Sequence, residues 1–189
     1  MSEKAPKRLS FLKELVKSQG VTQKELANRL GVTPQRVNMI FGKEDDCFLA
    51  RACEIAEAVG YKLSVELLPS ENRPEEEPVT INLQDYQYEG VAVKIKGDVQ
   101  VKNKPVYSYP SYISDCPKDK RLYFLACFIK EVNIPLFQIC GELGLSSSAV
   151  NYTFKNDNIL VSNIHKIAST YHMDVVWSIE KLPEAPGAD

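Results

Sequence analysis

The part of the sequence that most limits the fold is residues 21–41, VTQKELANRLGVTPQRVNMIF, where two short helical patterns meet at a glycine. Thr22 and Glu25 have the T-x-x-E spacing of a capping box, in which a threonine hydroxyl accepts a hydrogen bond from an amide of the first helical turn. The spacing therefore predicts a helix that begins at Gln23.

A second helix is predicted to begin almost at once. Gly31 supplies a turn, and Thr33 followed by Pro34 supplies a capping hydroxyl and a ring whose backbone angle suits the first helical position. Two helices joined by so short a turn must cross steeply, as in a helix-turn-helix. The apolar residues expected between them are Val21, Leu26, Leu30, Val32, Val37 and Ile40. The side chains expected to point outward, which are of types that hydrogen-bond to base edges, are Gln35, Arg36 and Asn38.

The chain has a formal net charge of −2, but this charge is distributed unevenly. Residues 1–43 carry nine Lys or Arg and three Glu, a net of +6, whereas residues 44–90 carry three basic and twelve acidic residues, a net of −9. A basic lobe next to an acidic segment is expected if only one face of the protein meets phosphate. Charge alone is equally consistent with a solvated surface whose charges happen to cluster.

Length and composition are those of a globular protein with one large domain or two small ones: 189 residues, 44% hydrophobic and 25% charged. No apolar run approaches the roughly 20 residues that span a bilayer, and the N-terminal MSEKAPKRL lacks an apolar segment of the secretory kind. We therefore expect a cytoplasmic protein that does not enter a membrane.

Catalytic and metal-binding patterns are scarce. His165 and His172, the two histidines, have no cysteine or carboxylate at ligand spacing, and no phosphate-binding glycine loop is present. The cysteines are odd in number and form no C-x-x-C pair, which favours reduced thiols of the core over a metal or redox role. They are Cys47, Cys53, Cys116, Cys127 and Cys140. We expect no enzymatic activity, no metal and no cofactor.

The two central helical patterns are flanked by further elements. Residues 9–18 and 48–59 carry apolar side chains at helical spacing, which predicts one helix before the pair and one after it. Residues 61–67 then alternate apolar and polar side chains up to Pro69, which is typical of a half-buried strand. Gly42 is expected to end the second helix of the pair, because glycine tolerates positive φ.

Residues 9–60 resemble the helix-turn-helix domain of the Cro and phage-repressor type, also called the xenobiotic-response-element class of bacterial and phage regulators. The resemblance rests on Thr22-Gln23, Leu26-Ala27, Leu30-Gly31-Val32, Val37 and Phe41-Gly42. It implies that Gln23 contacts a phosphate and that residues 33–36 and Asn38 face the major groove, although Pro34 departs from the polar residue usual at its position. The DNA contacts expected for this domain are Thr22, Gln23, Thr33, Gln35, Arg36, Asn38 and Lys43.

A boundary is predicted after the strand, because residues 70–82 are acidic and contain prolines, as linkers do. Farther on, residues 91–101 alternate around Gly97-Asp98 in the pattern of a β-hairpin. Five tyrosines lie within residues 84–112. We favour the interpretation that they cover a small sheet or a neighbouring domain; the alternative is a stacking platform for single-stranded nucleic acid.

The opening stretch recurs later in the chain. Shifted by 113 positions, residues 21–41 match residues 134–154, IPLFQICGELGLSSSAVNYTF, at core, turn and recognition positions. With a shift of 112 the similarity continues into a second alternating pattern, residues 173–179, which ends at Leu182-Pro183 as the first ends at Leu68-Pro69. We interpret this as two tandem copies of one unit, with terminal strands that pair antiparallel about a pseudo-two-fold axis. The alternative is two unrelated helical bundles.

The two copies are not equally equipped for DNA. Residues 21–43 carry a net charge of +3 and residues 134–156 carry zero, and Phe137 stands where the first copy has Lys24. Since phosphate contacts dominate affinity, the first copy is expected to bind DNA more strongly. The candidate contacts of the second copy are Ser146, Ser147, Ser148, Asn151 and Lys155.

The expected fold is mainly α with small β: two lambda-repressor-like helix-turn-helix bundles, each followed by a strand, joined by a linker that holds the hairpin. The expected domains are residues 1–69, a linker of 70–120, residues 121–183, and a tail of 184–189. The predicted function is sequence-specific binding of double-stranded DNA by a bacterial or phage transcriptional regulator, a repressor or antitoxin-like protein acting as a pseudo-dimer. The alternative is an interaction module in which only the first copy binds DNA and the second binds a protein partner or a second chain.

Overall fold

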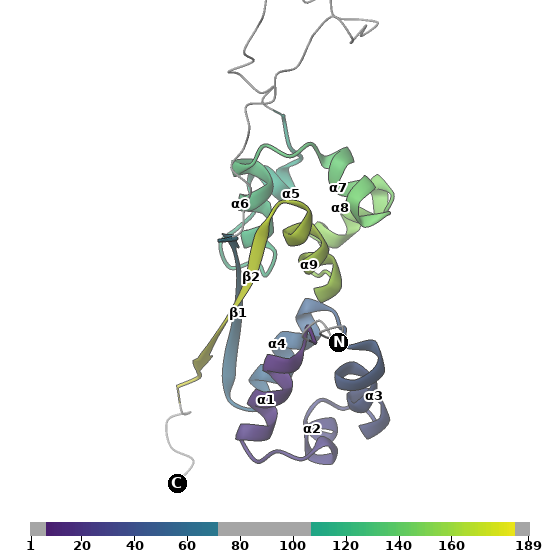
Figure 1. Ribbon diagram of the computed structural model, residues 1–189, viewed down its shortest axis with the longest axis vertical. Helices are drawn as coiled ribbons and strands as arrows, with labels where there is room; N and C mark the ends of the chain where they lie inside the picture. The colour runs from purple at the N-terminus through teal and green to yellow at the C-terminus, as the bar shows by residue number, and fades with distance from the viewer. Residues whose placement is uncertain (1–6, 72–106, 184–189) are drawn as a thin grey trace, which may run out of the picture.

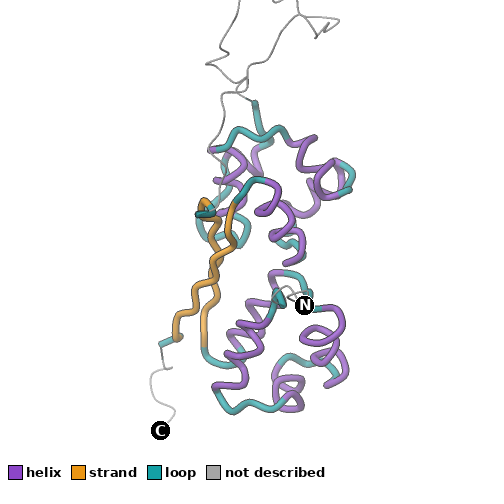
Figure 2. Tube along the Cα trace, in the orientation of Figure 1, coloured by secondary structure: helices purple, strands orange, loops and turns teal. Residues whose placement is uncertain are grey.

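The computed structural model describes residues 7–71 and 107–183. These residues are mainly helical, with one two-stranded antiparallel sheet (Figure 1, Figure 2). The predicted hairpin at residues 91–101 lies outside the described residues, as do Tyr86 and Tyr88. In chain order the elements are α1 (Ser10–Ser18), α2 (Gln23–Arg29), α3 (Pro34–Met39), the π-helical turn η1 (Ile40–Glu44), α4 (Leu49–Glu57), β1 (Tyr61–Pro69), α5 (Ser111–Ser114), α6 (Tyr123–Glu131), α7 (Leu136–Leu143), α8 (Ser147–Lys155), α9 (Val161–Thr170) and β2 (Met173–Lys181).

Local capping places α2 and α3 where the sequence predicts them. The Thr22 hydroxyl accepts a hydrogen bond from the Glu25 amide at 3.2 Å, and the Thr33 hydroxyl accepts one from the Arg36 amide at 3.2 Å. Gly31, at φ +63°, forms the turn between the two helices. The predicted helix-turn-helix is therefore confirmed, since each helix begins at its predicted cap.

The predicted end of the second helix at Gly42 is wrong. The chain continues through η1 to Glu44, and the left-handed residue that ends it is Asp45, at φ +46°. The physical reason is a contact distant in sequence. The Asp45 carboxylate accepts hydrogen bonds from the amides of Arg8 (2.8 Å) and Leu9 (3.3 Å), so the turn forms where it can cap the start of α1.

Two hydrophobic clusters make up the core, and they exchange residues. One cluster is built mainly from α1 to α4 and also contains Val161 of α9; the other is built mainly from α5 to α9 and also contains Leu49 and Val65. Trp177 of β2 packs against both clusters. We call α1 to α4 the first helical group and α5 to α9 the second. Their cores are continuous, so the two groups hold each other in place.

The ribbon formed by β1 and β2 joins the two groups along one side. The strands pair antiparallel over their whole length, with Val65 opposite Trp177, which confirms the predicted pairing of the two terminal strands. Leu63 and Val65 are buried, whereas Lys62 and Ser64 are exposed. Successive side chains of a strand point to opposite faces, which explains this alternation. The Trp177 ring stacks on Phe11 of α1 with centroids 4.8 Å apart.

A second junction joins the groups at the starts of α4 and α9. Phe48 and Leu160 form an isolated antiparallel bridge, in which the Leu49 amide donates to the Ile159 carbonyl oxygen at 2.7 Å. The ribbon and this bridge together connect segments more than 100 residues apart in the sequence. The long intervening segment therefore does not have to position the two groups.

Residues 107–116, which the sequence assigns to the linker, pack with the second helical group. Ile113 of α5 is fully buried in its core. The Tyr109 hydroxyl donates to the carbonyl oxygens of Ile129 (3.1 Å) and Ile134 (3.0 Å). A helix of four residues has no periodicity that a sequence pattern can reveal, which is why the sequence does not predict it.

All five cysteines are free, with Cys47 and Cys140 buried and the other three half-buried. Burial raises the pKa of Cys47 to about 12, so this thiol stays protonated. Within residues 7–71 and 107–183, no single helix is long and apolar enough to cross a membrane. The helices α6 and α7 reach that length and composition only as a pair, which is bent by 118°.

We predict that Phe11→Ala destabilises the whole molecule, because it removes the ring on which Trp177 stacks where the two clusters meet. The expected loss in unfolding free energy is about 2 kcal/mol, less than for a fully buried phenylalanine because Phe11 is half-buried. Urea unfolding followed by the fluorescence of the single tryptophan measures it. Lys13→Ala, an exposed change on the same helix, is the control; equal stability of the two variants would contradict the prediction.

Candidate nucleic-acid interface

The helix α3 exposes polar side chains on one face and buries the opposite face. Gln35, Arg36 and Asn38 are exposed, whereas Val37 is buried in the first cluster. The Thr33 side chain caps the start of this helix. Because Thr33 is exposed, its hydroxyl proton can still be donated to an acceptor outside the protein. The three side chains predicted to read bases are thus held on one rigid element.

Further polar groups from neighbouring elements lie in the same helical group. Thr22, at the cap of α2, and Gln23, its first residue, are exposed. Lys43 is exposed in η1, immediately after α3. Side chains of these kinds contact DNA phosphates through hydroxyl, amide and ammonium donors, and such contacts orient a protein on a duplex.

An acidic residue that the sequence reasoning missed holds Arg36. Nη1 of Arg36 donates to both carboxylate oxygens of Glu44, at 3.1 and 3.0 Å, with 49% of the Arg36 side chain exposed. The two residues are eight positions apart, so a regular helix would not bring them together. The π-helical turn does so, which means that the guanidinium must exchange or share this partner when it meets another acceptor.

Met39 is a second residue that the sequence reasoning missed. It ends α3 and is 46% exposed, although methionine is usually buried. It lies four residues after Gln35 and therefore on the same face of the helix. An exposed apolar side chain on such a face can contact the methyl group of thymine. The spacing from Gln35 is the signal that could have identified it.

The second helical group uses several of its candidate residues for its own contacts. The Ser146 hydroxyl caps α8 by accepting from the Ala149 amide at 3.2 Å, and the Ser147 hydroxyl accepts from the Cys140 thiol at 3.7 Å. Ser148 and Lys155 are exposed and make no such contact with another described residue.

Asn151 of α8 differs in its surroundings from Asn38 of α3. It is half-buried and its Oδ1 accepts a hydrogen bond from the Tyr112 hydroxyl of α5. Asn38, by contrast, is exposed. Asn151 is therefore less available for outside contacts than Asn38.

Two aromatic side chains stand out on the surface of the second group. Phe137 of α7 and Tyr152 of α8 are 71% and 70% exposed. They lie on the two helices that follow one another across the turn at Gly144, which has φ +65°. The surface of α7 and α8 thus carries two large and exposed aromatic side chains.

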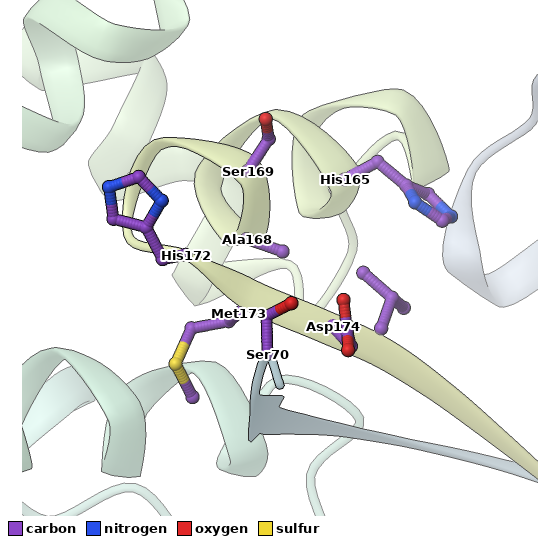
Figure 3. Close-up of a pocket in the computed structure, with 8 residues that line it drawn as sticks. Ser70, His165, Ala168, Ser169, His172, Met173 and Asp174 are labelled. Atoms are coloured by element: carbon purple, nitrogen blue, oxygen red, sulfur yellow. The ribbon is translucent and has the colours of Figure 1, made fainter. Parts of the chain in front are cut away.

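The two histidines line a pocket of about 340 Å³ beside the end of α9 (Figure 3). Figure 3 shows His165 and His172 at opposite ends of this pocket with their rings pointing away from each other. The His165 ring lies 6.4 Å from that of Trp177, and its Nε2 has no partner among the described residues. The geometry does not assemble a histidine pair. No group of three or more metal-ligating side chains occurs in the part of the chain that the structure describes.

Comparison with family models identifies the fold of the first helical group. Residues 12–42 match the family model described as Helix-turn-helix. The matched segment contains α2 and α3, so this part of the chain is similar to helix-turn-helix domains, a family of DNA-binding regulators. The match does not extend to the second helical group. Comparisons with curated proteins and with solved structures found no match.

We predict that Glu44→Gln increases the affinity of the helix-turn-helix for duplex DNA, because it frees Arg36 and removes a negative charge beside it. An exposed ion pair contributes at most about 1 kcal/mol, so the expected gain is roughly threefold to fivefold. Fluorescence anisotropy with a labelled duplex at low salt measures it. The matched control is Glu54→Gln, which removes the partner of Arg51 on α4. A gain of the same size in the control would show that only net charge matters.

We predict that acid destabilises the fold partly through His165. Burial, and then the Arg8 charge, lower the pKa of His165, while Asp46 and Asp45 act in the opposite direction. Because the folded-state pKa lies below the unfolded value, this contribution to stability is present above about pH 6.5 and is lost as the pH falls below it. His165→Gln should therefore weaken the fall in unfolding free energy between about pH 7.5 and about pH 5.5. Exposed His172→Gln is the control, and identical pH dependence in both variants would contradict the assignment.

Proposed function

We propose that the protein is a sequence-specific transcriptional regulator of the repressor or antitoxin-like kind, of bacterial or phage type. The observation that carries the proposal is the exposed polar face of α3 in a segment that matches a helix-turn-helix family. Gln35 and Asn38 suit adenine and Arg36 suits guanine, since these side chains form paired hydrogen bonds with those base edges. The residues that position the backbone are Thr22, Gln23, Thr33 and Lys43.

We further propose that the second helical group is a degenerate copy of the first and that the chain acts as a pseudo-dimer. The element boundaries support this. The helices α6, α7 and α8 begin 113 residues after α1, α2 and α3, and α9 and β2 begin 112 residues after α4 and β1. A spacing of 112 or 113 residues for five pairs of elements in the same order is unlike the pattern of two unrelated bundles.

Long-range contacts support the same relation. Asp157 accepts hydrogen bonds from the amides of Arg121 (3.1 Å) and Leu122 (2.9 Å). Asp45 accepts the same kind of hydrogen bonds from the amides of Arg8 and Leu9. Each residue of one set lies 112 or 113 positions from its counterpart in the other. Both aspartates have positive φ. Such a turn is unusual for a residue other than glycine, so its recurrence argues for common structure.

The two junctions fit a two-fold relation between the groups. Phe48 pairs with Leu160 and Val65 pairs with Trp177, and in each pair the two residues are 112 positions apart. Each junction thus pairs a residue with its own counterpart, as residues on a two-fold axis do. Figure 1 places α3 and α8 on the same side of the molecule and the ribbon on the other, which suits two helices entering successive major grooves.

The two half-sites are expected to be bound unequally. The first group presents Arg36 and Lys43, whereas the second presents Ser148 and Lys155, with its Asn151 bound to Tyr112. Since phosphate and guanidinium contacts supply most of the affinity, the first half-site dominates binding. The second half-site is contacted through Ser146, Ser147, Ser148, Asn151 and Lys155.

A second candidate function is favoured by the exposed aromatics of the second group. Phe137 and Tyr152 are the kind of side chains that anchor protein interfaces, and the net charge of residues 134–156 is zero. In this alternative only the first group binds DNA, and the second binds a protein partner or a second chain. Lys155→Ala and Ser148→Ala would then leave DNA affinity unchanged, whereas a pseudo-dimer requires both to lower it.

The proposal is tested by selecting bound sequences from random duplex DNA with the purified chain. Enrichment of two related half-sites about one helical turn apart supports the pseudo-dimer. A single enriched half-site supports DNA binding by the first group alone. The absence of any enriched sequence would overturn sequence-specific regulation.

We predict that Arg36→Ala weakens binding to the selected duplex by about 1 to 3 kcal/mol and relaxes preference at one base pair, because one paired contact with guanine is lost. Gel-shift titrations against the selected duplex and single-base variants measure both effects. Arg51→Ala removes the same charge from α4, away from α3, and is the matched control. Equal losses in the two variants would assign Arg36 a purely electrostatic role.

A further inference from the structure

Phe48, at the junction between the two helical groups, is 52% exposed although it is a large apolar residue. Its neighbours along the chain, Cys47 and Leu49, are buried, and so are Ile159 and Val161 on either side of its bridge partner Leu160. Side chains alternate between the two faces of paired extended segments. Phe48 and Leu160 therefore lie side by side and point away from the core, toward the surface.

The backbone that carries Phe48 is held firmly. Besides the hydrogen bond from the Leu49 amide to the Ile159 carbonyl oxygen, the Val161 amide donates to the Cys47 carbonyl oxygen at 2.9 Å. Two side chains reinforce this pairing from either side: Oδ1 of Asp46 accepts from the Ser162 amide, and Oδ1 of Asn158 accepts from the Ala50 amide, both at 3.0 Å. Four hydrogen bonds thus fix the backbone from which the exposed phenyl ring projects.

The place of this apolar pair within the molecule is defined by the two junctions. The bridge and the ribbon both border the core, because Leu63 and Val65 of the ribbon and Cys47 and Leu49 of the bridge are all buried in it. Figure 1 shows the starts of α4 and α9 meeting between α3 and α8. Phe48 and Leu160, which immediately precede α4 and α9, therefore lie at this meeting point between the two helices.

We propose that Phe48, supported by Leu160, inserts from the minor groove into the central base step of the DNA site and kinks the duplex there. When two helices occupy successive major grooves about one turn apart, the groove that faces the protein midway between them is the minor groove. Apolar side chains presented to the minor groove unstack a base step and bend the duplex toward its major groove. This inference rests on the proposed function, and it adds a contact that neither recognition helix makes.

Charges near the bridge agree with an apolar central contact flanked by phosphate contacts. The carboxylates closest to Phe48 in sequence are bound within the protein, since Asp46 accepts from Ser162, Asp45 caps α1 and Glu44 pairs with Arg36. Lys43 and Lys155, which end the two helix-turn-helix segments, are exposed. Among the described residues, the carboxylates nearest the centre of this side are therefore engaged within the protein, whereas each flank presents an exposed lysine.

The test uses the full chain and the duplex enriched in the selection above, with 2-aminopurine at the central step. Binding is expected to increase the fluorescence of this base, because it leaves the stack, and to shorten the distance between dyes on the two ends of the duplex. Phe48→Ala should abolish both signals and weaken binding roughly tenfold, as expected when a buried phenyl group is removed from a contact. Phe48→Leu, which keeps an apolar wedge, should retain part of both.

Leu68→Ala, an exposed apolar change on the ribbon, is the control and should leave both signals unchanged. Circular dichroism confirms that each variant is folded, and Phe48→Leu remains informative if Phe48→Ala does not fold. Binding of both half-sites without a fluorescence increase, or an increase that persists in Phe48→Ala, would overturn this inference and leave the proposed function intact. Failure to enrich any duplex would overturn both.

Selection repeated with Phe48→Ala provides an independent readout. Pyrimidine-purine steps unstack more easily than others, so the parent chain should enrich such a step at the centre of the site. The variant should lose this preference while it retains the preferences at the half-sites. An unchanged central preference in the variant would also contradict the insertion of Phe48.

Discussion

The packing of Trp177 against both helical clusters is the interaction on which the rest of the arrangement depends. This side chain comes from the last strand, stacks on Phe11 of the first helix and lies opposite Val65 in the ribbon. Because the two clusters also exchange Val161, Leu49 and Val65, neither helical group has a complete core by itself. The separation of α3 and α8 is therefore set by the contacts between the two clusters.

A rigid platform of this kind has consequences for DNA recognition. When the spacing of two reading helices is fixed, a duplex must fit that spacing or bend to meet it, so part of the specificity can come from DNA deformation. The Phe48 and Leu160 bridge stiffens the platform midway between the two helices. Inside the first group, the pairing of Arg36 with Glu44 gives the guanidinium a partner that a base would have to replace under the proposed function. Both features favour discrimination between DNA sequences over affinity for DNA in general.

Local sequence predicts the elements well, but it does not predict every contact that orders them. The caps at Thr22 and Thr33 and the strand up to Pro69 follow from short-range patterns, and the antiparallel pairing of the two strands is predicted from the internal repeat. The end of η1 at Asp45 does not, because the carboxylate is used 36 residues away at the start of α1. For the same reason the sequence predicts neither α5 nor the binding of Tyr112 to Asn151. Each depends on a partner that is distant in the chain.

The sequence by itself determined where helices and strands begin and which face of each is apolar, because capping and periodicity act within a few residues. It also determined that residues able to contact bases lie at Gln35, Arg36 and Asn38. Tertiary structure alone decided which of these groups are available. It paired Arg36 with Glu44 and placed Asn151 in a half-buried position. It also left Met39 and Phe48 exposed. The physical reason is that burial and hydrogen-bond partners are properties of the packed chain, and two helical groups more than 100 residues apart supply them to each other.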